Sequence, residues 1–252
     1  MRVLSYISYL GTYFNGWQKQ KKGERTVQGI IEDVLKKIYK KNINAVGAGR
    51  TDSGVHAKRQ AFHFDPPFHI DLKNLKKAFN SLLPWDVKVN SLIEVPDNFH
   101  ARKMVKSKVY LYRLANCDFP SPFDALTFGV VKYKLDIEKI KIFLKEFEGE
   151  KDFYKFTVFP NLYKSTKRKI IKTKFLIKNK KIYIFFEGNG FLRYQIRRMV
   201  GTLIEIARGK RDFNWFNSLW DKNSKEEAGA PVKASGLILL DVKYPEKYYG
   251  NN

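Results

Sequence analysis

The spacing of apolar residues switches repeatedly between two periods, and this pattern constrains the fold more than any other feature of the sequence. Residues 3–10 are apolar at most positions of both alternating sets, which predicts a strand buried on both faces. Residues 26–39 repeat at helical spacing, with Thr26 as a suitable N-cap. A second helix is predicted from Asp71, followed by a strand over 87–95. Strands and helices mixed in this way predict an α+β fold with antiparallel sheets.

The second half of the chain follows the same pattern. A hairpin is predicted around Asn179-Lys180, and the most regular helical spacing covers 191–208. No linker of distinct composition separates the halves, and we place a boundary near residue 103, between an N-terminal part (1–103) and a C-terminal part (104–252). The remaining predicted elements are strands over 45–46, 60–64, 105–114 and 236–242, and helices over 135–147 and 215–220.

The charge of the chain indicates a polyanionic partner. The 252 residues include 48 Lys and Arg against 25 Asp and Glu, a formal net charge of +23. Such an excess favours nucleic acid, or less readily an anionic membrane surface, as the partner. The alternative explanation is a genome biased toward lysine codons. A single cysteine, Cys117, excludes a disulfide within the chain and a four-cysteine zinc site. The N-terminus does not read as a signal peptide, and no apolar run approaches the ~18 residues of a membrane span, so we expect a cytoplasmic protein.

The segment 49–56, Gly-Arg-Thr-Asp-Ser-Gly-Val-His, is the densest cluster of chemically useful side chains. Its two glycines allow a sharp turn around Asp52. Arg50, two residues away, could hold that carboxylate ionised, as a nucleophile or a base requires. The alternative is an ordinary turn in which Asp52 and Ser53 accept hydrogen bonds from backbone amides.

Two further features could contact an anion. Arg197 lies at the edge of the apolar stripe of the helix predicted over 191–208, where its guanidinium needs an acidic side chain or phosphate, unless it extends to water. In the segment 11–22, aromatic, amide and basic residues alternate, which suits base stacking and phosphate contact, although the aromatic residues could instead belong to the core. No nucleotide-binding glycine loop, two-metal acidic cluster or nucleophile elbow is found in the sequence.

Six segments together resemble one family. The segment 48–57 resembles the AGRTDSGVHA motif of the tRNA pseudouridine synthase A family, and five others follow in the family's order: 9–20, 25–28, 99–102, 191–201 and 236–245. Leu10 departs from the family's usual Asp, and residues 161–169 align too poorly to carry any assignment.

The resemblance implies an isomerase that converts uridine to pseudouridine in the tRNA anticodon stem–loop, at positions 38, 39 and 40. It implies no cofactor and no metal, and a homodimer whose subunits both contact tRNA. The implied fold is the pseudouridine synthase α+β fold, with two antiparallel-sheet halves and helices flanking a basic central cleft. In that fold the part over 1–103 would carry the catalytic loop, and 104–252 would complete the cleft and the dimer interface.

The resemblance also assigns roles to single residues. Asp52 matches the catalytic aspartate, a nucleophile, and Arg50 the arginine of the same loop. Tyr110 matches the tyrosine that stacks on the target base, and Arg197 the arginine that pairs with the catalytic carboxylate. Contacts to the tRNA backbone are expected from Lys19, Lys21, Lys22, Arg25 and Lys58.

Three other interpretations remain open: a basic RNA-binding module without catalysis, a related enzyme that modifies other uridines, and a metal-dependent nuclease.

Overall fold

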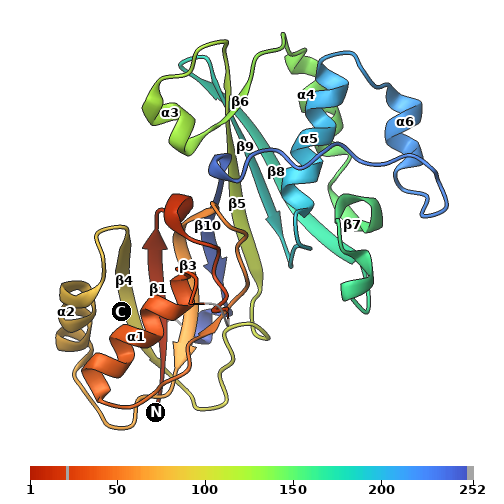
Figure 1. The fold of residues 1–252 in the computed structure, drawn as a ribbon. Coiled ribbons are helices and arrows are strands. Elements are labelled where there is room, and N and C mark those ends of the chain that lie inside the picture. Colours follow the sequence, from red (N-terminus) through yellow and green to blue (C-terminus); the bar gives the residue numbers. More distant parts are fainter. Residues whose placement is uncertain (21–22, 249–252) are drawn as a thin grey trace. The chain divides into compact units, whose positions relative to one another are not determined.

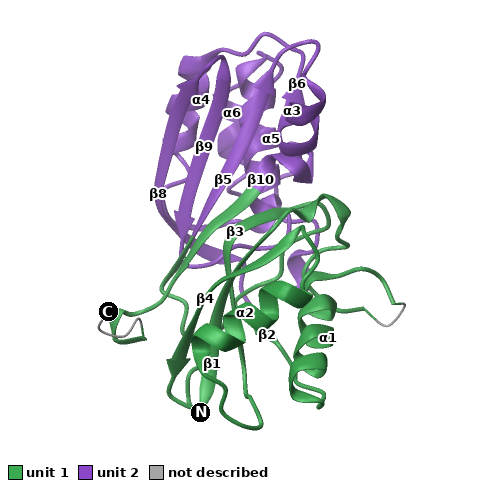
Figure 2. Ribbon diagram, turned by 90° about the vertical axis from the view of Figure 1, so that its left-hand side faces the viewer, with its two compact units in different colours: residues 1–108, 238–252 green, residues 109–237 purple. Residues whose placement is uncertain are grey.

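The structure is a computed structural model that describes residues 1–20 and 23–248. The chain forms two compact units, one of residues 1–108 with 238–252 and one of residues 109–237 (Figure 2). The division near residue 108 lies close to the predicted boundary at 103. The units are discontinuous in sequence, however, because the last residues belong with the first unit rather than with 104–237.

The first unit is built on a sheet in the order β4-β1-β3-β10 (Figure 1). The strands β1 (Arg2–Tyr9) and β3 (His56–Phe64) pair antiparallel, and β4 (Val87–Val95) pairs antiparallel with the other edge of β1. The short β2 (Val46–Gly47) pairs with β3. The strand β10 (Leu237–Lys243) runs parallel to β3.

Two helices begin at side-chain caps and pack side by side in this unit. In α1 (Val27–Tyr39), the Thr26 hydroxyl accepts a hydrogen bond from the amide of Gly29, as its position in the sequence predicts. In α2 (Leu72–Leu82), Asp71 accepts from the amide of Asn74 in the same way. The buried α2 side chain Phe79 meets Phe64 of β3, with 6.0 Å between the ring centroids.

An aromatic cluster explains why the end of the chain belongs to the first unit. The hydroxyl of Tyr244, just after β10, donates to the carbonyl of Ala101 over 2.6 Å. Its ring lies edge-on to Phe99 at 5.0 Å and to Tyr6 at 6.4 Å. Tyr248, in the 3₁₀ helix η5 (Glu246–Tyr248), also lies edge-on to Phe99, with 5.0 Å between the ring centroids. These contacts bury aromatic surface that residues 1–108 would otherwise expose.

The strands of the second unit are hydrogen-bonded in the order β5-β9-β8-β7. Its strands are β5 (Ser107–Asn116, from 109 on in this unit), β6 (Gly129–Val131), β7 (Gly149–Asp152), β8 (Lys167–Lys178) and β9 (Lys181–Gly188). The predicted hairpin is confirmed: Asn179 and Lys180 connect β8 to β9, and both have positive φ (50° and 59°). The β5–β6 pair is parallel, so each unit adds one parallel pair to the predicted antiparallel pairing.

Helices of the second unit are α3 (Pro122–Thr127), α4 (Ile137–Lys145), α5 (Gln195–Ala207) and α6 (Phe213–Ser218). Helices α4 and α5 pack together, and α4 lies against β8. Helix α5 begins four residues later than predicted. Tyr194 has a left-handed φ of 65°, and the Leu192 amide donates to the Gln195 side chain, so the chain turns before the helix begins. Short 3₁₀ turns complete the described fold: η1 (Gly11–Tyr13), η2 (Tyr154–Phe156), η3 (Pro160–Leu162) and η4 (Ala234–Gly236). The α+β prediction is confirmed.

Candidate active site

Asp52 lies in a tight turn that is anchored to the loop preceding α1. The Asp52 carbonyl accepts from the Val55 amide over 3.1 Å, and Gly54 supplies the positive φ of 78° that the turn requires. The Phe14 carbonyl accepts from the Ser53 hydroxyl (3.1 Å) and from the Gly54 amide (3.3 Å). The turn and the 11–17 loop therefore form one hydrogen-bonded structure.

Two glycines allow this loop to approach the turn. A Cβ on Gly16, whose φ is +80°, would lie 2.7 Å from the Thr51 carbonyl oxygen, and a Cβ on Gly11 would lie 2.0 Å from that of Val55. Under the turn, the Tyr9 hydroxyl lies 2.8 Å from Thr51 Oγ1, and burial raises the pKa of this phenol. The turn rests on a fixed, buried base while the Asp52 side chain remains half-buried.

Arg50 is exposed, and its Nε donates to the Gln18 side chain over 3.1 Å. Gln18 in turn donates to Gln28 over 2.6 Å, which ties the predicted loop arginine to the start of α1. The structure therefore places Arg50 and Asp52 on the same loop, as predicted, and also gives Arg50 an amide partner.

Lys108 is a cation near this loop that the sequence reasoning missed. Its ammonium donates to the Ala48 carbonyl over 2.9 Å and lies 2.4 Å from where a Cβ of Gly49 would stand. It therefore adds a positive charge to the 48–52 segment. Its lysine-rich surroundings in the sequence did not distinguish it from the other basic residues.

Tyr110 and Arg197 lie in the second unit. Tyr110, on β5, is 8% exposed, and its ring meets Phe191 edge-on at 5.1 Å. Arg197, on α5, is half-buried; its Nε donates to the Val232 carbonyl over 2.6 Å, and its guanidinium lies 4.9 Å from the centroid of the Tyr194 ring. Its pairing with Asp52 stays a prediction.

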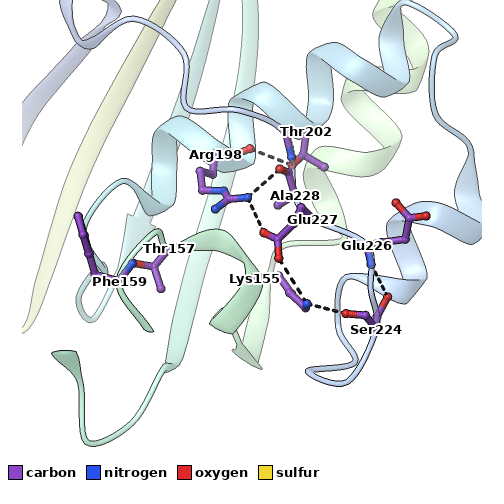
Figure 3. A network of polar contacts seen from close by, with 10 residues as sticks. Lys155, Thr157, Phe159, Arg198, Thr202, Ser224, Glu226, Glu227 and Ala228 are labelled. Carbon is purple, nitrogen blue, oxygen red and sulfur yellow. Dashed lines mark hydrogen bonds and ion pairs between the residues drawn. The ribbon is translucent and has the colours of Figure 1, made fainter. Parts of the chain in front are cut away.

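The neighbouring Arg198, also on α5, has a carboxylate partner inside its own unit (Figure 3). Its Nη2 donates to Glu227 over 3.0 Å and to the Ala228 carbonyl over 2.8 Å. Lys155 approaches the same carboxylate at 3.6 Å. Sequence spacing could not distinguish these roles, because both arginines lie near the apolar stripe and only the fold brings the 227–232 segment against α5.

The predicted backbone-binding residues have different surroundings. Lys58 is exposed, whereas Lys19 lies 3.1 Å from the Glu32 carboxylate. Arg25 donates two hydrogen bonds to the buried carboxylate of Asp86, over 2.9 and 2.8 Å. The other two predicted residues, Lys21 and Lys22, lie outside the described residues.

No group of three or more His, Cys, Asp or Glu in residues 1–20 and 23–248 could hold a metal ion. No helix in that part of the chain is long and apolar enough to cross a membrane.

Similarity to known proteins covers nearly the whole chain. A protein named tRNA pseudouridine synthase A from Ligilactobacillus salivarius is 42% identical over 245 residues, covering 96% of this chain and 95% of that one. One of the same name from Leuconostoc mesenteroides is 42% identical, covering 96% and 99%. A protein named tRNA pseudouridine synthase A 2 from Clostridium perfringens is 37% identical, covering 94% and 97%.

Among solved structures, a chain of a Cbf5-Nop10-Gar1 complex matches with 14% identity and a TM-score of 0.41, over 92% of this chain and 47% of that one. The chain thus spans about half the length of that protein.

A family model described as tRNA pseudouridine synthase matches residues 6–102 and 143–245. The first range contains the Asp52 turn and the loop that anchors it, and the second contains α5 with Arg197. Since the match extends through both units and the relatives cover 96% of this chain, the chain belongs to the tRNA pseudouridine synthase family.

Proposed function

We propose that this protein converts uridine to pseudouridine in the anticodon stem–loop of tRNA, at positions 38, 39 and 40, with Asp52 as the catalytic nucleophile. Membership of the family supports the isomerase activity on tRNA uridine. The observation that carries the choice of Asp52 is its place in a fixed turn, half-buried, inside a segment that the family model matches.

The reaction breaks the bond between uracil N1 and ribose C1′, rotates the base and forms a bond from C5 to C1′; C5 then loses its proton, and N1 takes one up. A base stacked in RNA is inaccessible to such chemistry, so the nucleotide must first be flipped out. In this proposal Tyr110 stacks on the flipped uracil, and the Asp52 carboxylate acts on the ribosyl or uracil group. An ionised carboxylate is required for that step, and Arg197 provides the positive charge beside it.

Other groups would hold the RNA around this site. Arg50 is exposed on the catalytic loop and would contact phosphate, with Lys58, Lys19 and Arg25 binding backbone elsewhere. Lys21 and Lys22, which belong to the same basic segment of the sequence, would have the same role. We expect the active species to be a cytoplasmic homodimer that needs no cofactor or metal.

The replacement Asp52→Asn tests the catalytic assignment. The amide has nearly the same shape, and the carbonyl of residue 52 can still accept the hydrogen bond from the Val55 amide, so the variant is expected to fold and to bind tRNA. Pseudouridine formation should fall by about a thousand-fold or more. The measurement is carbodiimide mapping of pseudouridine in unmodified tRNA, beside a filter-binding assay.

Asp33→Asn is the matched control, because it makes the same change on the exposed surface of α1. It should retain full activity. Substantial pseudouridine formation by folded Asp52→Asn would overturn the assignment. A wild-type protein that binds tRNA without modifying it would instead support a non-catalytic RNA-binding module, and modification elsewhere would indicate a related enzyme with other target uridines.

A further inference from the structure

Two aromatic side chains of the first unit stand out in solvent as a pair. Trp85, between α2 and β4, is 79% exposed, and Tyr13, at the end of η1, is 56% exposed. Their ring centroids are 6.2 Å apart, at an interplanar angle of 67°. Exposure of so much aromatic surface has a cost in water, which a bound partner would remove.

The segments that carry the pair are fixed to each other. Asp86, next to Trp85, has its side chain buried and accepts two hydrogen bonds from the Arg25 guanidinium. The same guanidinium donates to the Tyr13 carbonyl over 3.3 Å, and the Leu10 amide donates to the Asp86 carbonyl over 2.9 Å. The two rings are therefore presented by an ordered scaffold, which lowers the entropy lost on binding.

The pair is also connected directly to the turn that carries Asp52. Phe14, the residue after Tyr13, is 2% exposed and lies under the Arg25 guanidinium at 4.1 Å. Its carbonyl accepts the two hydrogen bonds from Ser53 and Gly54. A ligand that binds Tyr13 would thus have a fixed position relative to the catalytic turn, because the next residue, Phe14, is buried and is hydrogen-bonded to that turn.

The charge around the pair favours a nucleic acid over a protein partner. Lys88, three residues after Trp85, is exposed, and so is Lys58, whose carbonyl accepts from Asn90 of the same strand as Lys88. Lysine is depleted in the centre of protein interfaces, whereas aromatic rings among basic residues are typical of surfaces that bind single-stranded RNA. The whole chain carries a net charge of +23.

We propose that Tyr13 and Trp85 form a stacking platform for an unpaired nucleobase of the tRNA, at a nucleotide other than the target uridine. This inference rests on the proposed function, since it takes tRNA as the substrate. Every nucleobase offers a flat π face, so the platform fixes the position of the RNA without reading its sequence. The contact is the same in the ground state and the transition state, so it contributes to substrate binding rather than to the chemical step.

The test compares Trp85→Ala and Trp85→Phe with Phe68→Ala. Phe68 is a matched control in the same unit: its ring is 53% exposed and lies edge-on to Tyr39 at 5.1 Å. Trp85→Ala should raise both the Kd and the KM for tRNA by roughly 5- to 100-fold, with kcat changed less than about twofold. Trp85→Phe should recover part of the loss, and Phe68→Ala should behave as the wild type. The salt dependence of binding should keep its slope in Trp85→Ala, because no phosphate contact is removed.

Fluorescence supplies a readout that does not depend on turnover. Trp85 is by far the more exposed tryptophan when compared with the buried Trp17 and Trp215, so the signal lost in Trp85→Phe isolates its emission. Titration with tRNA should quench that difference signal and protect it from acrylamide.

Two results would overturn the platform. In the first, Trp85→Ala keeps the wild-type KM and the difference signal does not change on addition of tRNA. In the second, Trp85→Ala alters the sedimentation coefficient of the protein alone while leaving tRNA binding intact, which would make the pair a contact between protein chains. Failure of the proposed function looks different, because the wild type would then form no pseudouridine whatever happens at Trp85.

Discussion

The protonation state of His63, a buried residue of the first unit, makes the stability of the folded protein depend on pH. His63, on β3, is 4% exposed, and its Nδ1 accepts a hydrogen bond from the Ala101 amide over 3.1 Å. Burial, together with smaller effects of the charges of Arg2 and His100, lowers the pKa of His63 to about 4. The folded protein therefore holds this imidazole neutral.

We predict that the free energy of unfolding falls as the pH falls from about 6.5 to about 4. In the unfolded chain His63 has an ordinary pKa of about 6.5, so over this interval the unfolded state binds a proton that the folded state does not. The free energy of unfolding therefore has its full value above pH 6.5, and it decreases progressively between pH 6.5 and pH 4. The loss from this residue amounts to up to about 3 kcal/mol. Urea denaturation at a series of pH values measures it.

His63→Gln separates this effect from other titrations. A glutamine oxygen can still accept the Ala101 hydrogen bond but does not titrate. The hydrogen bond from Arg2 lowers the pKa of Asp65. Carboxylates of this kind contribute less to the free energy of unfolding at low pH, both in the wild type and in His63→Gln. The stability curve of His63→Gln should therefore be shallower between pH 6.5 and 4, and parallel curves would show that His63 is protonated without cost.

At the scale of elements, a helix boundary or turn could be predicted from sequence when the interaction that determines it joins residues close together in the chain. Thr26 and Asp71 cap helices with amides three residues away, and Asn179-Lys180 closes its own hairpin, so each was visible within a few residues. The start of α5 was not, because Tyr194 adopts a left-handed conformation that spacing does not reveal. The short α3 was also unforeseen.

The contact between the 11–17 loop and the Asp52 turn can be tested by replacing Gly16. Gly16→Ala would place a methyl group 2.7 Å from the Thr51 carbonyl and 3.2 Å from the Ser53 amide, so the turn must move. We expect a loss of about 2–4 kcal/mol in the free energy of unfolding. Pseudouridine formation should drop at least tenfold while tRNA binding is retained, because the displaced group is the proposed catalytic carboxylate rather than the basic surface.

Gly149→Ala is the control for this experiment. Gly149 also has a positive φ, +96°, but a Cβ there meets no atom within 4 Å. Its replacement carries the backbone strain alone, about 1 kcal/mol, and should leave activity unchanged. Equal losses in the two variants would show that conformational strain, not displacement of the turn, accounts for the effect of Gly16→Ala. The measurements are urea midpoints and initial rates of modification.

At the scale of the molecule, the sequence located the candidate site but not its supports. The Asp52 segment is contiguous, so its glycines and carboxylate could be identified together. Lys108 reaches the same loop from 60 residues away, and the partner of Arg198 lies 29 residues further along the chain. The exposure of Trp85 is not indicated by its sequence neighbours Pro84 and Asp86. Long-range placement of this kind follows from the fold rather than from local pattern.

The net charge of +23 has two explanations, and salt separates them. If the lysines bind phosphates, the KM for tRNA rises steeply with salt while kcat stays constant. Six to ten contacts correspond to a loss of about 10³- to 10⁵-fold in affinity between 50 and 200 mM.

Replacing single lysines should then change the salt dependence of tRNA binding by different amounts. Lys58→Ala should reduce the slope of log Kd against log salt by about one, whereas Lys19→Ala should reduce it less, because Glu32 already neutralises part of that charge. If the charge only reflects the composition of the genome, the slope is small and neither replacement changes it. Binding isotherms at four salt concentrations, with wild type and both variants, decide between these outcomes.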